Sequence, residues 1–154
     1  MAAADVIRDA AVQLREAGIE TPEHDAKLLL AEAAGVELRD VDKALLMGEE
    51  LGTAERFARF QSMLARRAKR EPLQYITGHA PFRYLDLKVG PGVFIPRPET
   101  ETVVQAGLDW LTRNGMIHPR VVDLCAGSGA IGLSVVGEVP GSQGWAVELA
   151  PNTA

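Results

Sequence analysis

The chain has 154 residues, of which 47% are hydrophobic and 24% charged, and its formal net charge at pH 7 is −5. This size and composition suit one or two small globular domains, and every apolar run is far shorter than the roughly 20 residues of a membrane-spanning helix. The negative charge argues against direct nucleic-acid binding, because such binding normally uses a cationic surface.

The first 70 residues have the apolar periodicity of helices separated by glycine. Gly18 is suited to the left-handed end of the first helix, Thr21 to the N-cap of the second, and Pro72 cannot continue the last. The apolar stripes predict a small helical domain over residues 1–72. We expect its helices over residues 4–17, 22–34, 39–47 and 53–70.

A cluster of positive charge, Arg66 to Arg70, ends the last of these helices. Cations are favourable there because the helix macrodipole is negative at its C-terminal end. We interpret the cluster as a solvated helix end, with partner binding as the alternative.

Residues 73–97 are rich in glycine, proline and β-forming residues, and apolar side chains alternate from Leu85 to Val89. This pattern predicts a β-hairpin followed by a rigid arm. Pro91-Gly92 is a turn signal, and later prolines hold the residues before them extended.

From residue 98 onward, helix and strand patterns alternate to residue 154. This order predicts a βαβ unit with two parallel strands, so the fold class is α/β. We expect a helix over 99–114, a strand over 120–124, a helix from about 129 and a strand over 144–149.

The single cysteine, Cys125, excludes an internal disulfide and a zinc site made of cysteine pairs. The three histidines lack the spacing of metal ligands. We therefore expect a cytoplasmic protein with no metal site, no membrane contact and no direct contact with nucleic acid.

The turn between the two predicted strands has the spacing G-x-G-x-x-G at Gly127, Gly129 and Gly132. Backbone amides of such a turn can approach a ligand, and an acid ending the second strand, here Glu148, can accept hydrogen bonds from ribose hydroxyls. This spacing fits any adenosine ligand, and a tight turn without a ligand is the alternative. Asp123 favours a ligand with an ammonium group, because its carboxylate would repel a pyrophosphate.

S-adenosylmethionine carries both an ammonium and a sulfonium group, and "DLCAGSG" from Asp123 to Gly129 resembles the first motif of class I methyltransferases. With residues 71–101, which contain "FIPRPETE", and the N-terminal helices, the chain resembles the release-factor glutamine methyltransferases, the HemK/PrmC family. The resemblance covers essentially the whole chain. It implies a helical domain for substrate recognition, a β-hairpin connector and the first βαβ of a Rossmann-like domain.

The implied activity is S-adenosylmethionine-dependent N5-methylation of the glutamine in the Gly-Gly-Gln loop of peptide-chain release factors, the protein partners. Glu148 stands where many members have Asp, and Cys125 stands where Gly is usual, so we expect a small buried thiol at that position. The implied cofactor-binding residues are Asp123, Cys125, Ala126, Gly127, Ser128, Gly129 and Glu148. The implied substrate-side residues, which we call the arm, are Phe94, Ile95, Pro96, Arg97, Pro98 and Glu99.

No catalytic residue is assigned within this chain. The family's Asn-Pro-Pro-Tyr motif, which fixes the substrate amide, occurs nowhere in the 154 residues. We therefore expect the N-terminal portion of a longer enzyme, inactive by itself. Two alternatives stay open: an NAD-binding oxidoreductase fragment, which leaves Asp123 and the arm unexplained, and a non-catalytic helical interaction module.

Overall fold

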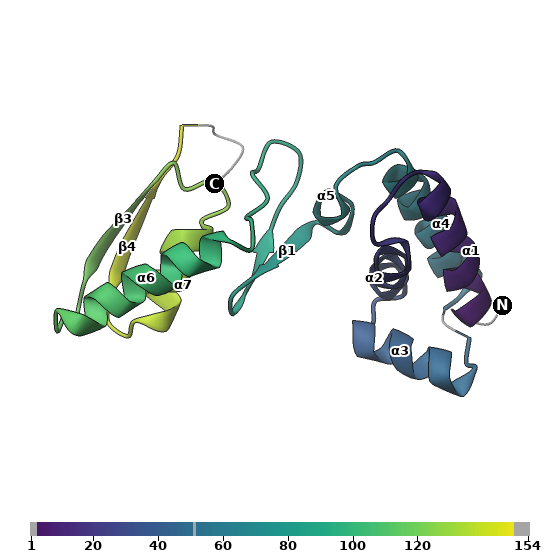
Figure 1. Ribbon diagram of the computed structural model, residues 1–154, viewed down its shortest axis with the longest axis horizontal. Coiled ribbons are helices and arrows are strands. Elements are labelled where there is room, and N and C mark those ends of the chain that lie inside the picture. Colours follow the sequence, from purple (N-terminus) through teal and green to yellow (C-terminus); the bar gives the residue numbers. More distant parts are fainter. Residues whose placement is uncertain (1–2, 51, 150–154) are drawn as a thin grey trace. The chain divides into compact units, whose positions relative to one another are not determined.

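The computed structural model describes residues 3–50 and 52–149, and it divides into two compact units, the first ending at Thr77 and the second beginning at Gly78. No helix in these described ranges is long and apolar enough to cross a bilayer. The chain combines helices with small sheets, which confirms the α/β class. The first unit contains α1 (Ala3–Glu16), α2 (Pro22–Ala34), α3 (Leu38–Met47), α4 (Ala54–Ala68) and α5 (Leu73–Thr77) (Figure 1).

The helical unit is built around one apolar core to which α1, α2 and α4 each contribute. Leu14, Leu29 and Phe60 are its fully buried centre. Gly18 and Gly35 follow α1 and α2 with φ of 73° and 65°, the left-handed conformation that ends a helix without steric cost in glycine. The predicted ends of these two helices are confirmed.

A partly buried ion pair connects the start of α2 to the end of α4. Arg67 Nε donates to Asp25 Oδ2 at 2.7 Å, and the side chains are 18% and 4% exposed. Thr21 occupies the N-cap position of α2, but its hydroxyl donates to Asp25 Oδ1 at 2.8 Å instead of accepting from the helix backbone. The interpretation of the basic cluster as a solvated helix end is therefore wrong for Arg67, which is drawn inward by a carboxylate 42 positions earlier.

Residues 73–77 form α5, which the sequence pattern did not predict. The carbonyl of Pro72 accepts hydrogen bonds from the N–H groups of Tyr75 and Ile76, and Ile76 is buried in the helical core. A helix of one turn is too short to show an apolar period. The first unit thus includes residues that the sequence analysis assigned to the hairpin segment.

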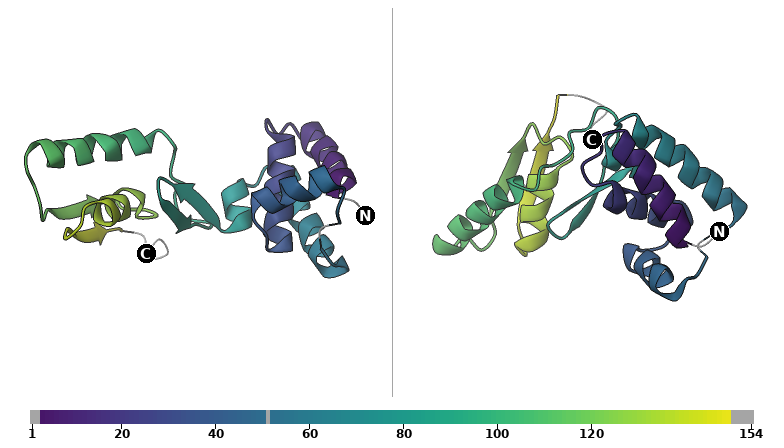
Figure 2. Two further views of the ribbon diagram at one scale, coloured as in Figure 1. Left: turned by 90° about the horizontal axis from the view of Figure 1, so that it is seen from below. Right: turned by 45° about the vertical axis from the view of Figure 1, so that its right-hand side comes forward.

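The second unit contains two separate pairs of strands. The antiparallel pair is a hairpin whose turn is Arg83-Tyr84, with Phe82 opposite Leu85. The parallel pair is joined through a helix, so the predicted βαβ unit is confirmed (Figure 2). The elements are β1 (His79–Phe82), β2 (Leu85–Lys88), α6 (Thr100–Arg113), β3 (Arg120–Leu124), α7 (Ala130–Glu138) and β4 (Gln143–Val147).

Helix α7 is the centre of this unit, because it contacts β2, α6, β3 and β4. Phe82 and Leu87 of the hairpin, Val104 of α6, and Ala130 and Val135 of α7 form one buried cluster. The hairpin and α6 are therefore packed against the helix that begins at the glycine turn.

The face of β3 and β4 that points away from α7 is apolar and exposed. Val121 and Asp123 face α7, so strand alternation places Val122 and Leu124 on the opposite face, where they are 58% and 70% exposed. Parallel sheets are normally covered on both faces. We call this surface the open sheet face; its residues are Val122, Leu124 and, by register, Trp145 and Val147.

Candidate functional site

The glycine loop, residues 125–129, connects β3 to α7 at the carboxyl ends of both parallel strands. Its backbone is left-handed at Cys125, Gly127 and Gly129, with φ of 58°, 55° and 75°. Gly129 N–H donates to the Ala126 carbonyl at 2.8 Å, which closes the turn. The sequence places glycine at two of the three positions where a side chain would be strained.

Glu148 directly follows β4, and its carboxylate lies against the glycine loop. Its Oε2 accepts a hydrogen bond from Gly127 N–H at 2.8 Å, and its Oε1 accepts one from Leu149 N–H at 2.7 Å. The strand ends at Val147, two residues earlier than the sequence pattern predicts. A carboxylate offers about four acceptor positions, so it can accept hydrogen bonds from these two backbone amides and from ligand hydroxyls together.

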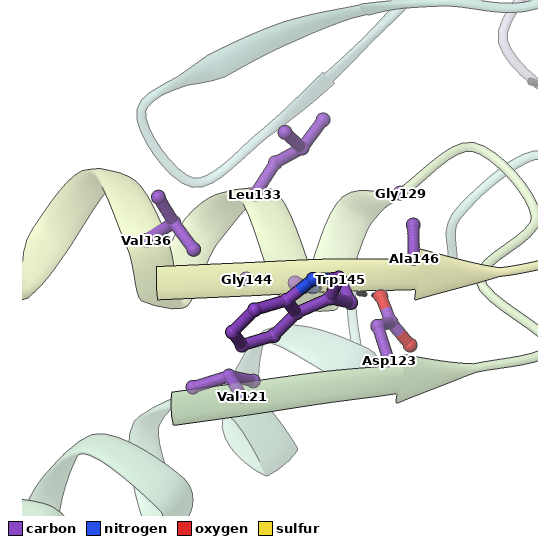
Figure 3. Close-up of a pocket in the computed structure, with 9 residues that line it drawn as sticks. Val121, Asp123, Gly129, Leu133, Val136, Gly144, Trp145 and Ala146 are labelled. Carbon is purple, nitrogen blue, oxygen red and sulfur yellow. Dashed lines mark hydrogen bonds between the residues drawn. The ribbon is translucent and has the colours of Figure 1, made fainter. Parts of the chain in front are cut away.

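Asp123 binds the first turn of α7 (Figure 3). Its Oδ2 accepts a hydrogen bond from Gly132 N–H at 2.8 Å, which satisfies a helix amide and places the negative charge at the positive end of the helix. A Cβ at Gly132 would lie 2.9 Å from this oxygen and 3.0 Å from the Cβ of Asp123. The third glycine of the motif is thus required by Asp123, a reason that spacing alone does not reveal.

Cys125 is exposed, so the expectation of a buried thiol is wrong. Continued strand alternation would have placed this side chain with Val121 and Asp123 on the face toward α7. The strand ends at Leu124, and the left-handed φ of 58° at Cys125 interrupts that alternation.

A small pocket adjoins the glycine loop, with a cavity volume of about 150 Å³. Ligand pockets for drug-sized molecules begin at about 300 Å³, so this cavity is too small for a whole nucleoside cofactor. Among the described residues, no group of three His, Cys, Asp or Glu could hold a metal ion. The pocket is lined by Val121, Asp123, Gly129, Gly132, Leu133, Val136, Gly144, Trp145 and Ala146 (Figure 3).

The arm approaches the glycine loop at Phe94. A Cβ at Gly127 would lie 3.9 Å from the Cβ of Phe94, which is ordinary van der Waals contact. The predicted turn at Pro91-Gly92 is confirmed, since Val93 N–H donates to the Gly90 carbonyl at 2.9 Å. Ile95 and Pro96 are half-buried, whereas Arg97, Pro98 and Glu99 lead directly into the start of α6.

An ion pair that the sequence analysis missed lies elsewhere in this unit, between Arg83 and Glu138. Arg83 Nε donates to Glu138 Oε1 at 2.6 Å, and the side chains are 11% and 20% exposed. Hydrogen bonding to Glu138 raises the pKa of Arg83, and hydrogen bonding from Arg83 lowers the pKa of Glu138. The two residues lie 55 positions apart, so no local pattern indicates the pair.

Residues 5–78 match the protein family described as the PrmC N-terminal domain. The release factor glutamine methyltransferase of Bifidobacterium longum (strain NCC 2705) is 87% identical over 150 residues, which cover 97% of this chain and 51% of that protein. The release factor glutamine methyltransferase of Streptomyces coelicolor (strain ATCC BAA-471 / A3(2) / M145) is 46% identical over 143 residues, which cover 93% of this chain and 48% of that protein. The release factor glutamine methyltransferase of Mycobacterium tuberculosis (strain ATCC 25618 / H37Rv) is 39% identical over 127 residues, which cover 82% of this chain and 39% of that protein. The chain thus spans about half the length of the first two of these relatives.

Proposed function

Since the chain belongs to the release factor glutamine methyltransferase family, we propose that it acts in the N5-methylation of a release factor's Gly-Gly-Gln glutamine, with S-adenosylmethionine as cofactor. The helical domain, residues 1–72, recognises the release factor, and the second unit begins a Rossmann-like methyltransferase domain. Such a substrate implies a cytoplasmic enzyme. The parallel βαβ unit supports the assignment of the second unit.

The observation that carries the cofactor proposal is the contact between Glu148 and the glycine loop. An acid 21 positions after Gly127 accepts a hydrogen bond from the Gly127 amide at 2.8 Å, at the carboxyl ends of two parallel strands. Ligands of open α/β sheets bind at this edge. A carboxylate held there can accept hydrogen bonds from the two hydroxyls of a ribose.

Each part of the site has a separate role in this proposal. S-adenosylmethionine supplies the methyl group when bound. Asp123 adds negative charge beside the loop, which favours a cationic ligand over a pyrophosphate. The cofactor-binding residues are Asp123, Cys125, Ala126, Gly127, Ser128, Gly129 and Glu148, and the arm (Phe94, Ile95, Pro96, Arg97, Pro98 and Glu99) lies on the substrate side.

Loss of the Glu148 carboxylate is expected to weaken binding of S-adenosylmethionine by about 10- to 100-fold, because hydrogen bonds to a charged group contribute about 1.5–3 kcal/mol. The protein to measure is a chimera in which this chain replaces the matching 150 residues of the Bifidobacterium longum relative. Isothermal titration calorimetry on the chimera and its Glu148→Ala variant gives the two dissociation constants.

The matched control is Glu148→Asp, which keeps both acceptor oxygens and is expected to change the affinity only a few-fold. Equal affinity of the chimera and its Glu148→Ala variant for S-adenosylmethionine would show that Glu148 does not contribute to cofactor binding. Tighter binding of NAD than of S-adenosylmethionine would refute the cofactor assignment.

A further inference from the structure

Arg83 is the first of the two residues that connect β1 to β2, and its φ is 51°. This left-handed conformation is uncommon outside glycine, asparagine and aspartate, and hairpin turns normally use those residues where φ is positive. A strained residue at a tight turn is a reason to look for a role of its side chain.

The side chain of Arg83 joins the hairpin to two helices. Its guanidinium binds the last turn of α7 with two parallel hydrogen bonds, Nε to Glu138 Oε1 at 2.6 Å and the terminal nitrogen to Glu138 Oε2 at 2.7 Å. It also donates to the Glu101 carbonyl at 3.3 Å and to Gln105 Oε1 at 3.0 Å, both on α6. The backbone N–H of Arg83 donates to Glu101 Oε1 at 3.0 Å.

The segment between β2 and α6 contains the arm, and no residue from 91 to 99 is buried. Residues 91–99 therefore have no core of their own, and their path depends on where the two ends of the segment are held. One end is the hairpin and the other is α6, and Arg83 binds α6 and α7 from the hairpin turn. Helix α7 begins directly after the glycine loop, against which Phe94 of the arm lies.

We infer that Arg83 is a positioning residue, which holds the arm beside the glycine loop by fixing the hairpin and α6 to α7. Arginine suits this role because its planar fork binds a carboxylate through two hydrogen bonds and keeps further N–H groups for other acceptors. The functional meaning of the inference rests on the proposed function, which places the cofactor at the loop and the substrate at the arm.

The test is hydrogen–deuterium exchange with mass spectrometry on the 154-residue chain, without added cofactor. In Arg83→Met, amides of residues 89–99 are expected to exchange about tenfold faster, while amides of β3 and β4 change less than about twofold. Glu138→Gln, which keeps the shape of the side chain but removes its charge, is expected to give a smaller rise in the same residues.

The matched control is Arg113→Met, an exposed arginine of α6 whose Nε donates to the Asp109 carbonyl, and it is expected to leave exchange in residues 89–99 unchanged. Arg83→Lys keeps the positive charge but lacks the planar guanidinium, and its exchange rates in residues 89–99 should fall between those of wild type and Arg83→Met. Unchanged exchange in Arg83→Met overturns the inference, as does a uniform rise over residues 78–149, because either result leaves Arg83 without a local effect on the arm. Failure to bind S-adenosylmethionine would contradict the proposed function only, since the exchange test contains no cofactor.

Discussion

Replacing Asp25 by alanine is expected to lower the free energy of unfolding of the helical unit by about 3 kcal/mol. The substitution removes the carboxylate that binds both Arg67 and Thr21, and it leaves Arg67, whose side chain is only 18% exposed, without its ionic partner. A loss of this size is a large fraction of the stability of a small domain. Urea unfolding, monitored by hydrogen exchange of residues 3–50 and 52–77, measures the free energy of unfolding of the helical unit.

Asp42→Ala is the matched control, because Asp42 and Lys27 form a more exposed pair, with side chains 48% and 32% exposed. Asp42→Ala is expected to lower the free energy of unfolding by less than about 1 kcal/mol. The double variant Asp25→Leu with Arg67→Met is expected to recover most of the lost stability, since apolar residues can replace a buried ion pair. Equal losses of unfolding free energy in Asp25→Ala and Asp42→Ala would show that burial does not strengthen the Asp25–Arg67 pair.

A second large difference is expected in the rate of methyl transfer. The Bifidobacterium longum chimera is expected to methylate the Gly-Gly-Gln glutamine of a release factor, whereas the 154-residue chain should be slower by at least about 10³-fold. An amide nitrogen is a poor nucleophile and needs fixed acceptors for its hydrogens. Within residues 78–149 as described, the parallel sheet has only two strands and one of its faces is exposed, whereas parallel sheets normally have further strands and cover on both faces.

Mass spectrometry of the release-factor peptide reads out the gain of one methyl group. A release factor with alanine in place of that glutamine is the negative control, and the chimera with Glu148→Ala tests dependence on the cofactor site. Turnover by the 154-residue chain comparable to that of the chimera would mean that the catalytic groups lie within these residues. Methylation of another residue would refute the proposed substrate.

Local signals predicted much of the secondary structure because they act within a few residues. Gly18 and Gly35 adopt the left-handed conformations that their positions after apolar helical patterns indicate. The βαβ unit follows from a strand, a glycine turn, a helix and a strand in that order. Helix α5 was missed because five residues do not complete two turns, so no apolar period can be seen.

The site was predicted less completely, because its geometry depends on contacts between distant residues. The spacing of Gly127 and Glu148 led to the prediction of both, and the structure joins them by a hydrogen bond. Asp123 was assigned from its charge and from its place in a methyltransferase-like motif, and neither indicated its observed contact with the Gly132 amide of α7. The Arg83–Glu138 pair joins residues whose own neighbourhoods in sequence contain nothing unusual, so only the folded chain reveals it.

The contact between Asp123 and Gly132 also has an evolutionary consequence. A side chain at position 132 and a carboxylate at position 123 compete for one volume, because a Cβ there would lie 2.9 Å from the carboxylate oxygen. Substitutions at the two positions should therefore be correlated among relatives: lineages that lose the acid become free to replace this glycine by alanine or serine, and those that keep the acid do not. The first two glycines, whose left-handed φ is independent of Asp123, should show no such correlation.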